Sequence, residues 1–308
     1  MKMTCGSSSS FSVSDKAVRW QVSAQDSGVR LPEALVRHGA LHLPSLKQAR
    51  RLIDAGRCSV NRRVRTLASA IVQVGDWIEV APPPATRMAR GCEILFEDQW
   101  LLVVNKSPGI TVEKENIERC VRKESFLVHR IDKDTSGILL IAKDEQTQEI
   151  LEGMFRDRKI QKTYLAIVDG RLERTHGTIR HSLKFKNRYH GQACWTATDE
   201  RSGKEAHTEY RRLAVQKEAS LVVLLPKTGR THQLRVHMAT IGHPILGDYR
   251  YADQFRCPLR PERQFLHAWK IAFIHPMTHQ PVEWTALVPE DMGKAAKVLF
   301  GRDVICVL

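Results

Sequence analysis

The sequence lacks the features that would place the chain in a membrane or in a disulfide-bonded class. No stretch approaches the ~20 apolar residues of a membrane span, and the first residues hold no apolar core or cleavage site of a secretory signal. The 7 cysteines form no CxxC pair and no metal-finger spacing. Because an odd, scattered set of thiols is typical of a reducing compartment, we expect a cytoplasmic protein without membrane contact.

Acidic residues are also in short supply. The chain has 34 Asp and Glu against 48 Lys and Arg, a formal net charge of +14 and a pI near 9.7. Such an excess favours a polyanionic partner, most often nucleic acid, although a merely basic enzyme explains the charge equally well. Residues 1–90 alone hold 14 Lys and Arg against 6 Asp and Glu, a net of +8. This concentration predicts a small basic unit joined to a larger, less basic one.

Residues 25–81 have the pattern of a small domain that contains a capped basic helix. Ser45 and Gln48 have capping-box spacing, in which each side chain satisfies a free amide of the first turn. Gly56 is expected to end the helix, and short strands joined by tight turns follow. The basic residues of this domain would face RNA phosphates; alternatively, they form a basic surface that is simply exposed to solvent. They are Lys47, Arg50, Arg51, Arg57 and Arg62.

Composition suggests where the domains begin and end. Residues 1–24 open with a serine run and are expected to form a tail, in which Val18–Val22 could add an edge strand. Residues 82–91 contain three consecutive prolines, which favour a stiff, extended linker. Residues 92–308 would then form the larger domain.

The polar segment 128–137 precedes an apolar run at 138–142 that is typical of a buried strand. A loop at the end of a buried strand is a good place for reactive groups. Two carboxylates, Asp132 and Asp134, lie too close in one loop to bracket a sugar as in a glycosidase. We expect Asp134 to cap backbone amides of the turn, and Asp132 to have a chemical role.

Two further segments carry unusual polar residues. Residues 226–237 follow an apolar strand, and residues 162–168 alternate as a strand should. A metal site from His232, His237 and His243 is not expected, because residues five apart on a strand point to opposite faces and helical spacing would be four. No metal is therefore predicted.

Taken together, these segments resemble one known family. HRIDKDTSG, KTYLAIVDG and TGRTHQLRVHMATIGHPILGD, in this order and with the later LHAWKIAFIHP, closely resemble RluA-type RNA pseudouridine synthases. The run from SLKQARRLIDAGRCSVN to VQVGDWIEV resembles the alpha-L RNA-binding domain. The resemblance implies an α+β fold with a mixed, mainly antiparallel sheet and a central cleft. NKSPG at 105–109 departs from the family's usual Lys-Pro-x-Gly, which affects the shape of that turn.

The resemblance also implies which residues act. Asp132 would be the catalytic carboxylate, Tyr164 the active-site tyrosine, and Arg235 the arginine that pairs with Asp132, which we expect to occur through a bidentate fork. Arg130 would occupy the place of the everted base, with a phosphate contact or a salt bridge to Asp134 as its alternative. The positions that would shape the pocket are His129, Thr135 and Lys162.

The implied reaction isomerises uridine to pseudouridine in RNA, and it needs no cofactor because nothing is oxidised or imported. The pairing with an alpha-L domain resembles family members that act on large-subunit ribosomal RNA, and transfer RNA is the second choice. A non-catalytic RNA-binding protein and an RNA glycosylase are the alternatives from other classes. We expect a monomer.

Overall fold

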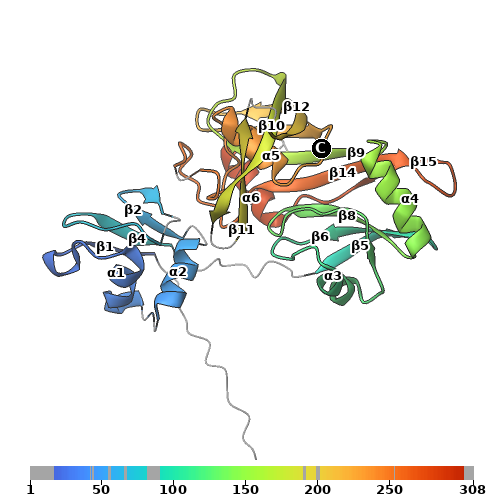
Figure 1. The fold of residues 1–308 in the computed structure, drawn as a ribbon. Coiled ribbons are helices and arrows are strands. Elements are labelled where there is room, and N and C mark those ends of the chain that lie inside the picture. Colours follow the sequence, from blue (N-terminus) through green and yellow to red (C-terminus); the bar gives the residue numbers. More distant parts are fainter. Residues whose placement is uncertain are drawn as a thin grey trace, which may run out of the picture. The chain divides into compact units, whose positions relative to one another are not determined.

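The computed structural model describes residues 17–41, 43, 45–54, 57–65, 68–81, 91–189, 192–198, 202–252 and 254–301. The chain divides into two compact units, Met1–Thr86 and Arg87–Leu308. In Figure 1 the first unit is blue to cyan and the second runs from green to red. The residues of the expected proline-rich linker lie outside the described ranges, apart from Gly91.

The first unit holds a four-stranded antiparallel sheet with the order β1-β4-β2-β3. Because β1 pairs with β4 along its whole length, it is an edge strand of this sheet, which agrees with the strand considered at Val18–Val22. The strands are β1 Val18–Gln21, β2 Cys58–Val60, β3 Arg63–Val64 and β4 Trp77–Val80, and the helices are α1 Leu31–Arg37 and α2 Leu46–Asp54.

Helix α2 begins as its sequence predicts. The Ser45 hydroxyl accepts a hydrogen bond from the Gln48 amide at 3.4 Å, which satisfies one free donor of the first turn. Ala49, Leu52 and Ile53 are buried in the core of this unit, whereas Leu46 is 42% exposed. The predicted stop at Gly56 lies outside the described residues.

The turn between β2 and β3 depends on Asn61. Asn61 and Arg62 have φ of 53° and 64°, the left-handed values that a two-residue hairpin turn requires. The Asn61 side chain donates to Asp76 at 2.7 Å and accepts from the Trp77 amide at 2.9 Å. These bonds hold Arg62 at an exposed hairpin tip.

The second unit is built on an 11-stranded sheet (Figure 1). Among the pairings of its described strands only β8 with β14 is parallel, so the predicted α+β fold with a mixed, mainly antiparallel sheet is confirmed. Along the main path the strands are β11 Gln192–Thr198, β10 His176–Tyr189, β12 Lys204–Val215, β13 Ala219–Pro226, β9 Gln161–Asp169, β14 Leu266–Ile274, β8 Ser136–Ala142, β6 Leu101–Lys106 and β5 Cys92–Glu97; β15 Pro281–Thr285 pairs with β14 and β7 Phe126–Leu127 with β8.

Within the described residues, four α-helices accompany this sheet: α3 Lys114–Val121, α4 Glu145–Arg156, α5 Gln233–Thr240 and α6 Glu290–Phe300. Successive side chains of a strand point to opposite faces, and β9 shows both faces covered. Leu165 and Ile167 lie in a core cluster with Met292 of α6, whereas Ala166 and Val168 lie in another with Leu234 of α5. Helices α5 and α6 therefore cover opposite faces of the central strands.

The described helices include none that is long and apolar enough to cross a membrane. The cysteines within the described ranges are free thiols. They are Cys58, Cys92, Cys120, Cys194 and Cys257.

Gly137 fixes the close approach of β8 to β14. Its φ is +109°, and a Cβ atom added there would lie 2.2 Å from the Ala268 carbonyl oxygen. No side chain fits this position without moving one strand away from the other. The glycine after the Asp132 loop is therefore required by the packing of two central strands.

We predict that Gly137→Ala lowers the free energy of unfolding by at least about 3 kcal/mol, because it combines a left-handed backbone with overlap against a neighbouring strand. Denaturant unfolding of the full chain measures this change. Gly293→Ala is the control: Gly293 lies inside α6 with open space around it, so alanine should stabilise the helix by about 0.5–1 kcal/mol. Equal effects of the two changes would contradict the prediction.

Candidate active site

The register of the central strands gathers the three sequence segments singled out above. Gly137 of β8 is aligned with Ala268 of β14, which is aligned with Tyr164 of β9. Tyr164 is aligned in turn with Leu224 of β13, the strand that leads into α5. The loop that carries Asp132, the tyrosine and helix α5 are thus brought together by strand pairing.

An ion-pair chain of three residues forms the centre of the site. Arg235 Nη1 donates to Asp132 Oδ2 at 2.9 Å. The other edge of the guanidinium donates twice to Asp248, from Nε and from Nη2, each at 2.7 Å. The bidentate pairing expected with Asp132 was therefore assigned to the wrong carboxylate: Asp248 holds the fork, and Asp132 receives a single hydrogen bond.

Burial separates the roles of the two carboxylates. The side chains of Arg235 and Asp248 are 5% and 1% exposed, whereas that of Asp132 is 26% exposed. A guanidinium buried between two carboxylates keeps its charge, and Asp248 is the main reason that the pKa of Arg235 is raised despite burial. Asp132 is the member of the chain that a substrate can reach.

Asp132 is ionised at neutral pH. Burial acts to raise the pKa of its carboxyl, but the charge and hydrogen bond of Arg235 outweigh burial and leave the pKa below its ordinary value. An anionic carboxylate in a partly enclosed site is available for covalent attack or for stabilising positive charge.

Tyr164 lies beside this carboxylate as a neutral phenol. Burial and then the negative charge of Asp132 raise its pKa above the ordinary range of tyrosine. Its ring packs between two core clusters that include Ile131 and Ala268 on one side and Leu224 on the other. A phenol that keeps its proton offers an apolar face and a hydroxyl, and it is a weak acceptor of protons.

His232 and Tyr251 form the other side of the site. His232 Nε2 lies 3.9 Å from Asp132 Oδ1, and its Nδ1 shares a hydrogen bond of 2.7 Å with the Tyr251 hydroxyl. The guanidinium of Arg235 lies over the Tyr251 ring, 5.0 Å from its centre. Burial lowers the pKa of His232 to about 4, so this imidazole is neutral. Neither residue was singled out from the sequence as part of the site.

The start of α5 is held by its own side chains. His232 has φ of 55° and precedes the helix as its N-cap. The Gln233 side-chain oxygen accepts from the Arg230 amide at 3.0 Å and from the Thr228 hydroxyl at 2.6 Å. These contacts turn the segment TGRTHQ so that Arg235 points toward Asp132.

His129 and Thr135 form hydrogen bonds that support the Asp132 loop and the strand after it. His129 Nε2 accepts a hydrogen bond from the Leu140 amide at 2.9 Å, and burial lowers its pKa to about 3, so the ring remains a neutral acceptor. The Thr135 amide donates to the Asp132 carbonyl at 3.1 Å, and its hydroxyl accepts from Gln264 at 3.2 Å.

Two buried cations also hold this loop, and neither was singled out from the sequence. Lys106 is fully buried, and its Nζ donates to the carbonyls of Ser107, Ile110 and Lys133, each at 3.0 Å. Arg263 donates to the Asp134 carbonyl at 3.2 Å. The expected capping of amides by the Asp134 side chain is absent from the described contacts, so Asp134 contributes its main chain instead.

Lys106 predicts a specific pH dependence of stability. Burial lowers its pKa to about 8 from an ordinary 10.5. Between pH 8 and 10.5 the unfolded chain binds more protons, so this residue makes the free energy of unfolding rise with pH, by up to about 3 kcal/mol. Below pH 8 both states are protonated and the slope vanishes. We expect Lys106→Met to remove this rise, as measured by denaturant unfolding across pH 7.5–10; parallel curves for the two proteins would contradict the assignment.

The remaining candidates at this site differ in exposure. Lys162 is partly buried, with its ammonium 5.8 Å from the centre of the Phe155 ring, and burial lowers its pKa. Arg130 is exposed, and among the described residues its side chain has no ion pair, so the alternative salt bridge to Asp134 is not formed. Arg130 is therefore available to contact a substrate.

The basic residues of the first unit that were expected to contact RNA also differ in exposure. Lys47, Arg50 and Arg62 are exposed. The Arg57 guanidinium donates twice to the Ala81 carbonyl, at 3.2 and 2.6 Å, which gives it a structural contact. The side chain of Arg51 lies outside the described part of the structure.

The three histidines considered for a metal site have separate partners. The segment that carries His237 is helix α5 and not a strand. His237 contacts Thr208 at 2.9 Å and His243 contacts the Asp169 carbonyl at 2.9 Å, while His232 is bonded to Tyr251. Within the described residues no group of three His, Cys, Asp or Glu could hold a metal ion.

Comparison with known proteins identifies the family. The model for RNA pseudouridylate synthase matches residues 100–240, and the model for the S4 domain matches residues 29–78. Ribosomal large subunit pseudouridine synthase C of Vibrio cholerae is 35% identical over 275 residues, which cover 80% of this chain and 85% of that protein. The chain belongs to the RluA-type RNA pseudouridine synthase family. This synthase is an isomerase that converts uridine to pseudouridine in RNA.

Two further similarities agree with this identification. Ribosomal large subunit pseudouridine synthase D of Zymomonas mobilis is 38% identical to this synthase over 232 residues, covering 67% of this chain and 72% of that protein. The solved structure of human RNA Pseudouridylate Synthase Domain Containing 1 superposes with a TM-score of 0.57 at 28% identity, covering 66% and 85% of the two chains. The expected family, fold and N-terminal RNA-binding domain are confirmed, and RNA is the partner.

Proposed function

We propose that this synthase isomerises uridines of large-subunit ribosomal RNA. The names of the relatives from Vibrio cholerae and Zymomonas mobilis, both described as ribosomal large subunit synthases, support this choice of RNA. We also propose that it acts as a monomer, since one chain brings all three proposed catalytic residues together, and that it acts in the cytoplasm, where thiols stay reduced.

The hydrogen bond between Arg235 and the ionised Asp132 is the observation that carries the proposed mechanism. The reaction breaks the bond between ribose and the base nitrogen, rotates the uracil and joins the sugar to a ring carbon. That carbon then loses its proton and the released nitrogen gains one, so the product is an isomer of the substrate. A carboxylate suits this sequence because it can attack covalently or stabilise positive charge at the sugar carbon. Asp132 is the group in the site with both the charge and the exposure that this task requires.

Arg235 and Tyr164 would prepare this carboxylate. Because Asp248 fixes the guanidinium on its other face, Arg235 presents one N–H to Asp132 in a set orientation, and little reorganisation is needed during the reaction. Tyr164, which keeps its proton, would place its ring and hydroxyl against the uracil and limit the entry of water. We therefore assign it a positioning role in preference to that of a general base.

Arg130 would stabilise the RNA while the target base is outside the stack. Everting a base costs a few kcal/mol, and a guanidinium inserted into the gap offsets part of that cost. Its exposure and its position two residues before Asp132 support this role.

The S4 domain would bind RNA backbone through the exposed face of α2. We predict that the double variant Lys47→Ala, Arg50→Ala lowers the slope of log affinity against log salt by about 1.4–1.8, because each lost phosphate contact removes about 0.7–0.9. Filter binding of large-subunit ribosomal RNA between 50 and 200 mM salt measures the slope. Arg37→Ala, an exposed cation already paired with Asp26 in the same unit, is the control. A slope identical to wild type in the double variant would show that α2 does not contact phosphates.

Purified synthase incubated with unmodified large-subunit ribosomal RNA and, separately, with transfer RNA tests the proposed substrate. We expect pseudouridine in the ribosomal RNA at unchanged mass and without released uracil. Pseudouridine in the transfer RNA alone would overturn the choice of substrate. Release of free uracil would indicate a glycosylase.

A further inference from the structure

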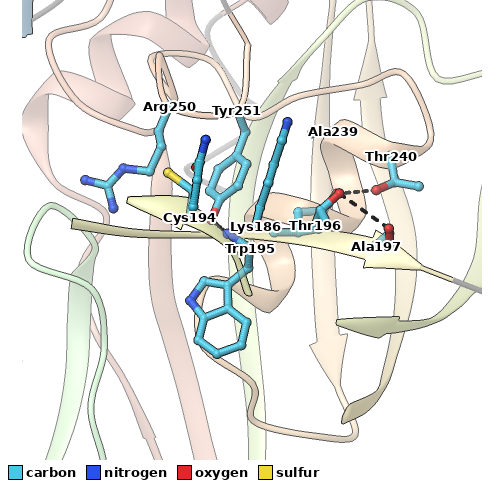
Figure 2. A pocket seen from close by; sticks show the side chains of 11 residues that line it. Lys186, Cys194, Trp195, Thr196, Ala197, Ala239, Thr240, Arg250 and Tyr251 are labelled. Atoms are coloured by element: carbon cyan, nitrogen blue, oxygen red, sulfur yellow. Dashed lines mark hydrogen bonds between the residues drawn. The ribbon is translucent and has the colours of Figure 1, made fainter. Parts of the chain in front are cut away.

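A cavity of about 340 Å³ lies next to the catalytic centre, between α5 and the β10–β11 hairpin (Figure 2). Its volume is within the ~300–1,000 Å³ range of small-ligand sites. Helix α5 contributes Val236, Ala239 and Thr240, and the loop after it contributes Arg250 and Tyr251. The hairpin contributes the rest of the wall, including Lys186, Asn187 and Thr196.

The charge of this cavity favours an anionic ligand. Lys186 and Arg250 line it, and none of its eleven described lining residues is acidic. Figure 2 shows Arg250 on one side of the Tyr251 ring and Lys186 on the other. Strands β10 and β11 together carry four Lys and Arg and no Asp or Glu, so the hairpin extends the positive surface beyond the cavity.

Other groups of the cavity match a nucleobase better than a bare anion. Asn187 provides a side-chain amide for a base edge, and the Thr196 and Thr240 hydroxyls, which already donate to backbone carbonyls, provide acceptors. Val236 and Ala239 provide an apolar floor. The Tyr251 ring is a flat face of the kind on which bases stack, and such stacking tolerates any base. A phosphate alone would leave the apolar and aromatic part of this wall unused.

The cavity and the catalytic carboxylate share residues. Tyr251 lines the cavity and is hydrogen-bonded to His232, which lies 3.9 Å from Asp132. Arg250 also lines the cavity, and its positive charge is close enough to contribute to the lowered pKa of Asp132. A strand with one nucleotide at Asp132 would therefore bring a neighbouring nucleotide to Tyr251.

We propose that this cavity receives a second nucleotide of the RNA strand, a near neighbour of the target uridine, with its base against Tyr251 and its phosphate toward Lys186. The inference rests on the proposed function insofar as RNA occupies the catalytic centre. It adds a specific role: the second nucleotide anchors the distorted strand and offsets part of the cost of unstacking the target.

The proposed contact between Lys186 and the phosphate is tested with Lys186→Ala. The matched control is Lys217→Ala, which changes an exposed lysine in the turn between β12 and β13 that does not line the cavity. The probe is an in vitro transcript of large-subunit ribosomal RNA. We expect Lys186→Ala to raise the dissociation constant about tenfold and to lower the log–log salt slope by about 0.7. The control should change neither. Equal effects of the two variants would overturn the inference.

The proposed stacking of the base against Tyr251 is tested with Ala239→Leu, which fills the cavity without changing its charge. It should weaken binding of the same transcript by about 5- to 150-fold, the scale of one lost base–aromatic stack, with an unchanged salt slope. Wild-type affinity in a folded Ala239→Leu protein would contradict the proposal.

Photo-crosslinking tests the site without altering the cavity. The transcript is made with 4-thiouridine and bound to the full-length Asp132→Asn protein. Crosslinks on the peptide that contains Tyr251 or on the peptide that contains Cys194 and Trp195 are expected. Crosslinks confined to the Asp132 loop and the first unit would refute the second subsite.

Isomerisation of the transcript by wild type is measured in parallel. No isomerisation would reject the proposed substrate. Normal isomerisation, with Lys186→Ala and Ala239→Leu binding as tightly as Lys217→Ala, would reject the second subsite alone.

Discussion

Replacing Asp132 with asparagine should stop isomerisation while the protein stays folded and binds RNA. The asparagine oxygen can still accept the hydrogen bond from Arg235, so packing is retained, but the negative charge that the reaction uses is gone. We expect the single-turnover rate to fall by about 10⁴-fold or more, the scale on which removing one catalytic group slows an enzyme. Unchanged RNA affinity would separate this loss from a defect in binding.

Asp134→Asn is the matched control for this prediction. It makes the same chemical change two residues away in the same loop, but the Asp134 side chain has no hydrogen bond among the described contacts, and its role is carried by its carbonyl. Its rate should stay within about twofold of wild type. Comparable losses in both variants would show that the charge of the loop matters and that Asp132 has no special role.

Asp248→Asn should be the most destabilising change at the site. It removes the negative charge of the bidentate partner of Arg235, and the guanidinium, with a side chain 5% exposed, is left with the single hydrogen bond to Asp132 as its only ion pair among the described residues. Breaking a buried pair in this way costs about 3–5 kcal/mol, and the loss of orientation of Arg235 should also reduce isomerisation. Thermal unfolding and single-turnover assays at a temperature where the variant is folded measure the two effects.

Glu283→Gln provides the comparison for Asp248→Asn. Glu283 pairs with Lys270 at 3.5 Å, with its side chain 57% exposed, and such surface pairs contribute about 0–1 kcal/mol. If Asp248→Asn is no more destabilising than Glu283→Gln, the buried pair with Arg235 does not hold the site together.

Several elements could be predicted because their signals are local. The cap at Ser45 and the buried strand at 138–142 depend on neighbouring residues, and the structure has both of them. The pairing of Asp132 with Arg235 was expected from family resemblance alone, since the two are 103 positions apart. Strand register, which no local pattern encodes, brings them together.

The sequence did not reveal residues whose partners are distant in the chain and become neighbours only in the fold. Asp248 stands at the end of a motif already singled out, but nothing in its spacing shows that its carboxylate faces Arg235. Lys106 was seen only as part of an unusual turn, because a lysine is seldom fully buried, and its three carbonyl acceptors become neighbours only in the fold. The available signals were a single charged residue in each of two short segments: Asp248 in ILGD and Lys106 in NKSPG.

The pH profile of single-turnover isomerisation tests most directly whether Asp132 reacts as a carboxylate held ionised by Arg235. The pKa of Asp132 lies below the ordinary value of aspartate, and burial lowers the pKa of the neighbouring His232 to about 4. The rate should therefore be constant between about pH 5 and pH 7.5. A rate that falls as the pH is lowered through 6 would show that burial has outweighed the guanidinium, and it would contradict the account.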